Sequence, residues 1–416
     1  MRIVHLSTNA HGGAARAACR LHRGLRGVGL DSRMLVQFKT DDDPTVRGPA
    51  AAAGRMMARL RRHLDSWPVR LYRRRRDALF SPAIVPERLA SQVAALGADI
   101  VHLHWVAYGF LRIEGLRAFR RPLVWTLHDM WPFTGGCHIA GDCGRYRVSC
   151  GQCPILGSSR EGDLSRWVWR RKRRAWKGLP LTVVSPSRWL AECAQDSALF
   201  QGGRTEVIPL GIDIAHFRPS DQRFARELLS LPQDRRLILW GTTGRLDNPL
   251  KGFRFLQAGL RELTKMNGMA SVELVVFGSS EPADPPDLPV RAHFLGRLRD
   301  DVSLALLYAA GDVLAVPSPQ ENFPQVAVEA LACGTPVVAF ATTGLLDVVE
   351  HQGNGYLAEP LSAHSLAQGL AWVLEDGERR QALSRRARQK AEAEFSLQVM
   401  AQRYADLYRD ILGERS

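Results

Sequence analysis

Residues 319–339 indicate the fold and read Pro319-Gln320-Glu321-Asn322-Phe323-Pro324-Gln325-Val326-Ala327-Val328-Glu329-Ala330-Leu331-Ala332-Cys333-Gly334-Thr335-Pro336-Val337-Val338-Ala339. Apolar, strand-like segments stand on either side of a helical stretch. Pro324 lies where the helix would begin, and Gly334 lies where it would end. Glu321 is therefore expected on the loop that leaves the first strand, and Glu329 is expected to point from the helix toward the same region.

This pair of carboxylates suits a polyhydroxyl ligand. Ligands of open α/β sheets bind outside the carboxyl ends of the strands, and each carboxylate can accept hydrogen bonds from two vicinal hydroxyls. A solvated helix face is the alternative, because two glutamates eight positions apart occur on many helices. The Phe-Pro between the two glutamates and the Gly-Thr-Pro-Val-Val run after them make that alternative the less favoured one.

The segment resembles the E-x7-E motif of the family 4 retaining glycosyltransferases. The resemblance implies the GT-B fold, in which two Rossmann-like, doubly wound α/β domains enclose a cleft and a C-terminal helix crosses back to the first domain. It also implies that Glu329 holds the ribose hydroxyls of a nucleotide. Glu321, with the backbone of Asn322 and Phe323, would then hold the donor sugar.

The length of 416 residues suggests two domains, since a single core rarely grows that large. Apolar strands alternate with helical stretches, as in parallel sheets covered by helices. The clearest strands are expected at Ile3–Leu6, Asp99–Trp105, Leu123–Leu127, Leu181–Val184, Leu237–Trp240, Val272–Phe277, Asp312–Val316 and Val337–Phe340. We expect an acceptor-binding domain over residues 1–206 with the helix 397–416, and a donor-binding domain over residues 207–396.

The charge is strongly basic and unevenly placed. The formal net charge is +14, and residues 1–205 carry 34 Lys and Arg against 15 Asp and Glu. This asymmetry indicates an anionic partner of the first half. No apolar run reaches the roughly 18 residues that a membrane-spanning helix needs. The start of the chain looks like a buried strand rather than a signal peptide, so a cytoplasmic protein is expected.

Arg245 and Lys251 flank a loop that follows a strand and opens a helix. Loop amides and a helix N-terminus favour anions, and Arg adds bidentate hydrogen bonds. A surface Arg and a helix-start Lys without a ligand are the alternative. The family has an Arg and a Lys at this spacing, which implies that Arg245 and Lys251 hold the pyrophosphate and stabilise charge on the departing nucleoside diphosphate.

Glycines after other strands are candidates for further donor contacts. Gly12 and Gly13 follow the first strand and would let the backbone approach a phosphate or sugar closely. A tight turn without a ligand is the alternative there. The resemblance implies that residues after a second glycine meet the nucleotide base, which here are Arg297 and Leu298.

His128 and Asp129 end the strand Leu123–Leu127. The resemblance implies that His128 contacts the donor sugar beside the reacting carbon, while Asp129 orients His128 or the acceptor hydroxyl. A buried, hydrogen-bonded histidine is the alternative. The catalytic residues expected from the resemblance are therefore His128, Glu321, Arg245 and Lys251, with no catalytic metal.

Four cysteines fall within seventeen residues, in the pattern C-x5-C-x6-C-x2-C. The spacing in a loop-rich segment suggests a structural zinc site, with free or redox-paired thiols as the alternative. His138 is a substitute ligand. The surrounding sequence, Thr126 to Cys137, resembles a subgroup of family 4 found in exopolysaccharide clusters, colanic-acid assembly among them. The expected zinc ligands are Cys137, Cys143, Cys150 and Cys153.

Two stretches, Arg55–Arg76 and Arg166–Lys177, interleave arginines with tryptophan and other apolar residues. This mixture suits the headgroup layer of an anionic membrane. A solvated basic face is the alternative. Nucleic acid is a poorer fit, because no recognised binding module is present.

We therefore expect a retaining glycosyltransferase that moves a sugar from a UDP- or GDP-linked donor to a lipid-linked glycan in cell-surface polysaccharide synthesis. It would sit peripherally on the inner face of the cytoplasmic membrane. Two alternatives remain: another GT-B enzyme, such as a sugar-nucleotide epimerase or a phosphorylase, or a non-catalytic scaffold that binds membranes or nucleic acid.

Overall fold

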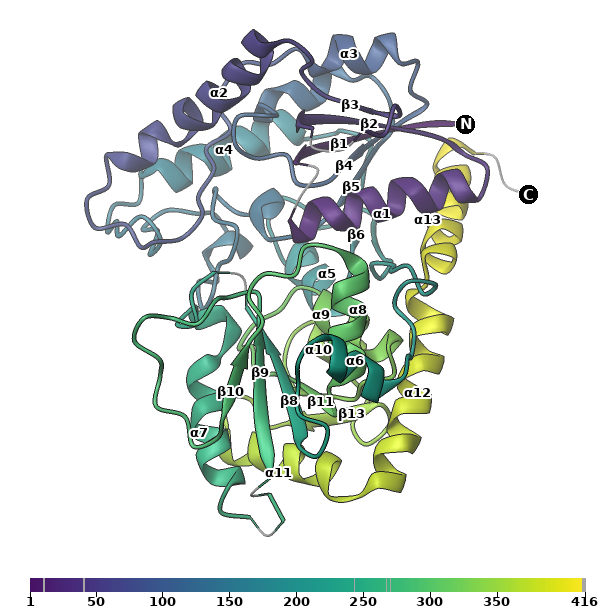
Figure 1. Ribbon diagram of the computed structural model, residues 1–416. Coiled ribbons are helices and arrows are strands. Elements are labelled where there is room, and N and C mark those ends of the chain that lie inside the picture. Colours follow the sequence, from purple (N-terminus) through teal and green to yellow (C-terminus); the bar gives the residue numbers. More distant parts are fainter. Residues whose placement is uncertain (10–11, 40–41, 243, 267, 270, 414–416) are drawn as a thin grey trace. The chain divides into compact units, whose positions relative to one another are not determined.

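A computed structural model describes residues 1–9, 12–39, 42–242, 244–266, 268–269 and 271–413. The chain forms two compact units. Unit 1 comprises residues 1–211 and 400–416, and unit 2 comprises residues 212–399. Each unit is an α/β body built around one parallel sheet (Figure 1).

Unit 1 contains, among its described residues, a seven-stranded parallel sheet in the order β3-β2-β1-β4-β5-β6-β7. The strand order reverses at β1, which has β2 on one side and β4 on the other, as in doubly wound folds. The strands are β1 Arg2–Asn9, β2 Asp31–Phe38, β3 Val46–Arg47, β4 Ile100–Leu103, β5 Leu123–Thr126, β6 Leu181–Ser185 and β7 Thr205–Val207.

Helices connect these strands, as the parallel arrangement requires. Their bounds are α1 Gly13–Gly27, α2 Ala52–Arg70, α3 Leu89–Ala95, α4 Leu164–Trp176 and α5 Arg188–Gln195, with the short 3-10 turns η1 Ile113–Ala118, η2 Trp131–Phe133 and η3 Arg145–Arg147. The last helix, α13 Leu397–Leu412, contributes its residues from Met400 onward to unit 1.

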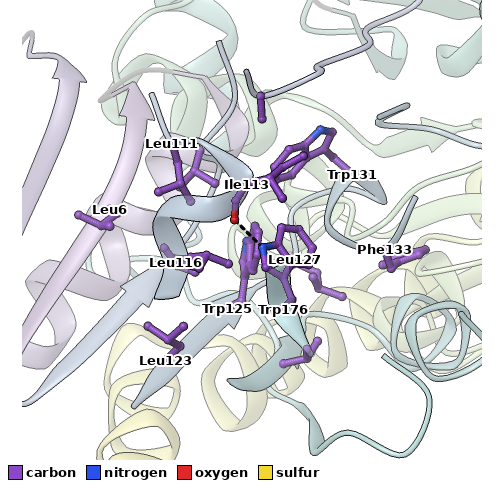
Figure 2. Packing of buried hydrophobic residues seen from close by; sticks show 14 of the residues in the cluster. Leu6, Leu111, Ile113, Leu116, Leu123, Trp125, Leu127, Trp131, Phe133 and Trp176 are labelled. Atoms are coloured by element: carbon purple, nitrogen blue, oxygen red, sulfur yellow. Dashed lines mark hydrogen bonds between the residues drawn. The ribbon is translucent and has the colours of Figure 1, made fainter. Parts of the chain in front are cut away.

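The core of unit 1 is rich in tryptophan (Figure 2). Trp125 on β5 is fully buried and lies edge-on to Trp176 of α4, with ring centroids 5.3 Å apart. The Trp176 indole donates to the Ile113 carbonyl at 2.8 Å, so its polar atom is satisfied within the apolar core. These contacts fix α4 and η1 against the sheet.

Helix α13 is joined to the sheet of unit 1 by buried polar contacts. The hydroxyl of Tyr404 lies 2.6 Å from Thr126 Oγ1, and the hydroxyl of Tyr408 lies 2.6 Å from Nδ1 of His102. Both tyrosines are fully buried. The C-terminal helix therefore belongs to the first body, although almost 190 residues separate it from the rest of that body.

Unit 2 contains, over the residues described, a six-stranded parallel sheet in the order β10-β9-β8-β11-β12-β13. The order reverses between β8 and β11. The strands are β8 Arg236–Gly241, β9 Val272–Phe277, β10 Ala292–Phe294, β11 Val313–Val316, β12 Val337–Phe340 and β13 Gly355–Ala358. The helices are α6 Gln222–Leu228, α7 Phe253–Leu263, α8 Asp301–Ala310, α9 Gln325–Ala332, α10 Leu345–Val348, α11 Ala363–Glu375 and α12 Gly377–Phe395, with the 3-10 turn η4 Pro249–Lys251.

The stretch 319–339 folds almost as expected. Pro324 is the N-cap of α9, one position before the first helical residue at which it was expected. Gly334 has φ 78°, which is a left-handed conformation that glycine adopts without strain after a helix. The helix therefore stops there, and β12 begins three residues later.

Helix α2 is unusual because it buries little of its own surface. Over 19 residues, only Ala58 and Asp65 are buried, while Met56, Leu60 and Trp67 are 69%, 47% and 60% exposed. Among the described residues, no helix has both the length and the apolar character that crossing a bilayer requires.

Candidate active site

The reversal point of the sheet in unit 2 brings two candidate residues into contact. Lys251 ends the turn after β8, Glu321 lies on the loop after β11, and β8 pairs with β11. Lys251 Nζ lies 2.6 Å from Glu321 Oε1, and the two side chains are 27% and 16% exposed. Ser318 Oγ donates to the same carboxylate oxygen at 3.0 Å. The result is a half-buried ion pair at the carboxyl end of the sheet, where α/β ligands bind.

Two glycines let the backbone close around this pair. Gly252 has φ 67°, and a Cβ there would lie 1.8 Å from the Pro317 carbonyl oxygen, so another residue would force the two loops apart. A Cβ on Gly344 would meet the carbonyl oxygen of Asn322 at 2.2 Å. The Gly344 amide also donates to the Glu321 carbonyl at 2.9 Å. Residues 321–322 are therefore clamped between the start of α7 and the loop after β12.

Glu329 lies deeper than Glu321. It is 2% exposed on α9, and its Oε2 accepts a hydrogen bond from the Tyr308 hydroxyl at 3.1 Å. Phe323 between the two carboxylates is also buried and packs edge-on against Phe395. The buried Phe323 side chain therefore packs against α12, and only its backbone remains for a ligand.

Arg245 occupies a different environment. Its side chain is 85% exposed and forms an ion pair with Asp247 at 2.6 Å. The hydrogen bond and the charge of Arg245 hold the pKa of Asp247 below its ordinary value. The described contacts thus join Lys251 to Glu321 and Arg245 to Asp247.

Glycine-containing loops stand side by side after β8, β9 and β10. The Gly278 amide donates to the Gly296 carbonyl at 2.7 Å. Gly278 has φ 83°, and a Cβ there would lie 1.8 Å from the Thr242 carbonyl oxygen. Arg297 is exposed and Leu298 is half-buried on the loop that follows Gly296.

In unit 1, Gly12 is the N-cap of α1, with φ 98° and ψ 169°. A Cβ at Gly12 would have no heavy atom within 4 Å, so the conformation, rather than crowding, favours glycine there. Gly13 is the first residue of the helix. Both glycines lie between the carboxyl end of β1 and α1. Ala10 and His11 of the same motif lie outside the described residues.

His128 belongs to a chain of imidazoles that runs from the middle of β1 to the carboxyl ends of β4 and β5. Its Nε2 lies 3.1 Å from Nδ1 of His104, and Nε2 of His104 lies 2.9 Å from Nδ1 of His5. Burial lowers the pKa of His128 to about 4, although the nearby Asp129 charge opposes the shift. The pKa values of His5 and His104 fall well below the ordinary value, chiefly through burial. All three histidines are therefore neutral at pH 7.

Asp129 does not orient His128, contrary to one of the two expectations for it. Its Oδ2 lies 2.5 Å from Nδ1 of His138 and accepts from the Trp105 indole at 2.7 Å, while Oδ1 accepts from the Trp131 amide at 2.8 Å. Burial alone would raise the pKa of Asp129, but these partners hold it below its ordinary value.

The four clustered cysteines line one cavity of about 10 Å³. Cys137, Cys150 and Cys153 are buried, Cys143 is half-buried, and none forms a disulfide. Burial raises the pKa of Cys150 to about 12. His138 is engaged by Asp129 and by Ser81 Oγ at 2.9 Å, so both of its ring nitrogens already have protein partners.

Only one group of described residues places three potential ligand atoms within 4.8 Å of one another, namely His5, His102 and His104. Their hydrogen bonds to His128, Thr126 and Tyr408 account for this arrangement. The cysteine sulfurs share a cavity without reaching that proximity.

Comparison with known proteins identifies the family. Residues 11–216 match the model of Glycosyltransferase Family 4, and residues 263–390 match that of Glycosyl transferases group 1. A D-inositol 3-phosphate glycosyltransferase of Xylanimonas cellulosilytica is 33% identical over 337 residues, which cover 76% of this chain and 73% of that protein. This chain belongs to the family 4 glycosyltransferases. The Mycobacterium tuberculosis (strain H37Ra) protein of the same name is 35% identical over 334 residues, covering 76% of this chain and 62% of its own length.

Solved structures show that this glycosyltransferase has the GT-B fold. Sucrose-phosphate synthase from Thermosynechococcus elongatus has a TM-score of 0.70 at 23% identity, with full coverage of both chains. HepE of Anabaena, solved with UDP and glucose, has a TM-score of 0.64 at 21% identity and covers 99% of this chain and 100% of its own. WaaG, described as a glycosyltransferase of lipopolysaccharide biosynthesis, has a TM-score of 0.62 at 18% identity, covering 98% of this chain and 99% of its own.

Sequence reasoning missed several residues of these sites. Tyr308 lies on a helix of almost uniformly apolar residues, so nothing in the sequence marks it as the partner of Glu329. Thr343, which accepts from the Glu321 amide at 3.0 Å, follows an unremarkable strand end. His104 had a signal: it ends the His102-Leu103-His104 repeat on a predicted strand, at the same end as His128.

Proposed function

We propose that this glycosyltransferase uses a nucleoside diphosphate sugar and transfers the sugar with retention of configuration. The observation that carries this proposal is the Lys251–Glu321 ion pair at the reversal point of the sheet in unit 2. A cation and a carboxylate held 2.6 Å apart match the two halves of such a donor. The ammonium binds diphosphate oxygens, and the carboxylate binds sugar hydroxyls.

In the proposed mechanism, Lys251 neutralises the charge that develops on the β-phosphate as the bond from the sugar to its oxygen breaks. This preorganised electrostatic contribution is commonly the largest in such a reaction. Arg245 is exposed enough to turn from Asp247 to the diphosphate. The departing phosphate oxygen accepts the proton of the acceptor hydroxyl, so no strong protein base is required.

Glu329 is proposed to bind the ribose hydroxyls. Its burial and its hydrogen bond to Tyr308 hold the carboxylate in one orientation before the nucleotide arrives. The Gly278–Gly296 backbone hydrogen bond holds the neighbouring loops together, and the base is proposed to lie beside Arg297 and Leu298. In unit 1, Gly12 and Gly13 are proposed to face the donor with their backbone, and neutral His128 is proposed to hydrogen-bond the donor sugar.

Donor identity is tested by thermal stabilisation with UDP, GDP and ADP. A ligand at 100 times its Kd raises the free energy of unfolding by about 2.7 kcal/mol. We expect UDP to stabilise most, because HepE shares the fold and was solved with UDP. A protein that none of the three nucleotides stabilises would refute the proposed donor site. Nucleotide release that requires an acceptor but not inorganic phosphate would separate transfer from epimerisation and phosphorolysis.

For the acceptor, we propose a lipid-linked glycan reached at an anionic membrane surface. The apolar face of α2 is exposed, and five cations of α4 and its C-cap line one open cavity of about 530 Å³. Among the described residues, Arg170, Arg173, Arg174 and Lys177 form no ion pair with an acidic group, so they remain available for phosphates. Each basic residue near such a surface contributes roughly 1 kcal/mol.

A second acceptor class is favoured by the names of the relatives. Proteins 33% and 35% identical to this chain are D-inositol 3-phosphate glycosyltransferases. Both acceptor classes carry phosphate, but only one requires a membrane. Assays with D-inositol 3-phosphate and with polyprenyl-diphosphate-linked sugars would therefore decide between them.

We also propose that Cys137, Cys143, Cys150 and Cys153 bind one structural zinc ion. Their shared cavity is about the size of one small ion or water, and the amide of Gly135 donates to Cys150 Sγ at 3.0 Å. Buried Lys172 lies close enough to Cys150 and Cys137 for their charges to influence it. Burial lowers the pKa of Lys172 to about 7, and thiolates around zinc would favour its protonated form. Elemental analysis should find one zinc per chain, and Cys150→Ser should lose it; a metal-free, fully folded protein would refute the site.

A further inference from the structure

A large cavity lies beneath α2 in unit 1. Its volume is about 920 Å³. It lies between β2, β3, α2, α3 and the segment before α3, and it is open to solvent on one side. Ligand sites typically have volumes of about 300–1,000 Å³. A space of this size is therefore large enough to hold a ligand.

The walls of the cavity are mainly apolar. They include Leu35 and Val36 from the sheet, Ala58 from α2, Leu89 and Leu96 from the α3 region, and Phe110. All six side chains are buried. The apolar walls therefore suit hydrocarbon, and the gain on binding comes mainly from the apolar surface that the ligand itself removes from water.

One polar atom in the wall lacks a partner. Gln37 is 5% exposed, and its Nε2 donates to the carbonyl oxygens of Ala58 at 2.9 Å and Tyr108 at 3.2 Å. Its Oε1 is buried and, among the described residues, accepts no hydrogen bond. Buried acceptors are normally satisfied, so this oxygen suits a water molecule bound beside the ligand.

Two exposed cations line the cavity. Arg47 and Arg88 line it, and both are exposed. Within the described part of the chain, neither forms an ion pair with an acidic side chain. The acidic residue nearby, Glu87, accepts a hydrogen bond from the Leu89 amide. An anionic headgroup would therefore meet positive charge at Arg47 and Arg88, beside the apolar walls.

We propose that this cavity binds a hydrocarbon chain of an anionic lipid, with the lipid phosphate at Arg47 and Arg88. The inference deepens the proposed membrane function and rests on it, because α2 supplies Met57, Ala58 and Arg61 to the cavity and also carries the exposed apolar face. A helix lying on a membrane would place the cavity directly behind it, so a lipid chain could enter from the bilayer. The lipid that we propose to bind there is the lipid-linked acceptor.

The test measures binding of alkyl phosphates to the purified full-length protein by calorimetry, below their micelle concentrations and without vesicles. We expect octyl, decyl and dodecyl phosphate to bind with Kd falling roughly tenfold for each two added methylenes. Inorganic phosphate is the headgroup control and should bind far more weakly. Equal affinity for all chain lengths, or no binding at all, would overturn the proposal.

Two matched variants on α3 test whether the alkyl chain lies in the cavity. Ala95 lines the cavity and Ala94 does not, although both are exposed on the same helix. We expect Ala95→Trp to weaken dodecyl phosphate binding at least tenfold, while Ala94→Trp leaves it unchanged. Replacing both Arg47 and Arg88 with alanine should weaken every alkyl phosphate by a similar factor and keep the chain-length dependence. If the two tryptophan variants weaken binding equally, the alkyl chain does not lie in this cavity. Vesicle-binding and transfer assays test the proposed membrane function separately.

Discussion

At the scale of single residues, Lys251 and Glu321 depend on each other. Each side chain is less than a third exposed and contributes the nearest opposite charge to the other. A donor diphosphate would replace the carboxylate as the partner of Lys251 and would free Glu321 for the sugar hydroxyls. The ion pair therefore keeps the unliganded site satisfied and is easily exchanged for substrate.

Lys251→Ala is expected to lower kcat roughly 100-fold or more, with a smaller change in KM, because the charge it stabilises develops mainly in the transition state. Arg245→Ala should act in the same direction. Steady-state kinetics with the donor identified by thermal stabilisation would measure both. Arg254, an exposed arginine on the following helix that packs over Phe255, provides the control. Lysine and arginine variants that behave like Arg254→Ala would contradict the assignment.

Glu329→Ala should act mainly on donor affinity. The carboxylate is proposed to bind ribose in the ground state and in the transition state alike, so its loss raises Kd for the nucleotide and leaves kcat nearly unchanged. Calorimetry with the free nucleoside diphosphate measures this directly. Tyr308→Phe removes the hydrogen bond to Glu329 Oε2 but keeps the ring, and a weakening smaller than that of Glu329→Ala is expected.

His128 should be the Nδ1–H tautomer. The buried Nε2 of His5 ends the imidazole chain and has no partner among the described residues, and a buried orphan acceptor is more readily tolerated than an orphan N–H. The His5 proton therefore lies on Nδ1 and is donated to His104, which in turn donates from Nδ1 to His128 Nε2. Nitrogen-15 spectra of the imidazoles would report the tautomer, and His104→Leu should abolish its preference. An Nε2–H signal for His128 in the unchanged protein would contradict this order.

The places of Glu321 and Glu329 in the fold of unit 2 were predictable from sequence because each residue carries a local signal. Pro324 and Gly334 bound the helix of Glu329, and a strand precedes Glu321. The Lys251–Glu321 contact was not predictable in the same way, since 70 residues separate the pair and only the adjacency of β8 and β11 brings them together. For Asp129, adjacency in the sequence was misleading, because its hydrogen-bond partner is His138 and not the neighbouring His128.

At the scale of elements, sequence patterns predicted the strands with continuous apolar runs and missed those with polar interruptions or few residues. All eight expected strands are present, β1 and β12 among them. β2 was missed because Asp31, Ser32 and Arg33 open it, although its later residues are buried. β7 and β10 have three residues each and lie at sheet edges, where little burial is needed.

Helix α2 is the element whose role should be most sensitive to substitution. Met56, Leu60 and Trp67 are largely exposed and lie along one helix face, so their replacement by serine removes apolar surface without disturbing the fold. We expect the triple variant to lose most of its binding to anionic vesicles in a sedimentation assay while its melting temperature changes little. Binding to neutral vesicles should be weak for both proteins. Undiminished binding of the triple variant would remove α2 from the membrane contact.

Helix α4 should supply the electrostatic part of the same binding. Arg170, Arg173 and Arg174 line its open cationic cavity, and their replacement by glutamine should make vesicle binding weaker and less sensitive to salt. Arg171 on the same helix should be left unchanged, because it pairs with Glu114 and donates to the carbonyl oxygens of Pro82 and Ala83. Its loss would disturb the fold of unit 1 rather than a surface contact.

At the scale of the whole molecule, the buried histidines make stability depend on pH. His5, His22, His102, His104 and His128 all have pKa values lowered by burial, to about 4 for His22 and His128. In the unfolded chain they would titrate near 6.5. Below that pH the unfolded chain binds more protons than the folded protein, so the free energy of unfolding falls as pH falls from 6.5 toward 4. Above pH 6.5 the histidines are neutral in both states and do not lower the free energy of unfolding.

This loss should be steep, because each histidine that is protonated only on unfolding contributes about 1.4 kcal/mol per pH unit across the window. Eight of the ten tryptophans lie in unit 1, which also holds these five histidines, so tryptophan emission during urea unfolding at several pH values is a suitable measurement. His128→Gln should reduce the slope of stability against pH between 6.5 and 4 by about one proton, whereas His63→Gln, an exposed position on α2, should leave it unchanged. A protein whose unit 1 unfolds at the same urea concentration at pH 7 and pH 4.5 would show that these imidazoles accept protons in the folded state, and the hydrogen-bonded chain of neutral histidines behind His128 would then have to be abandoned.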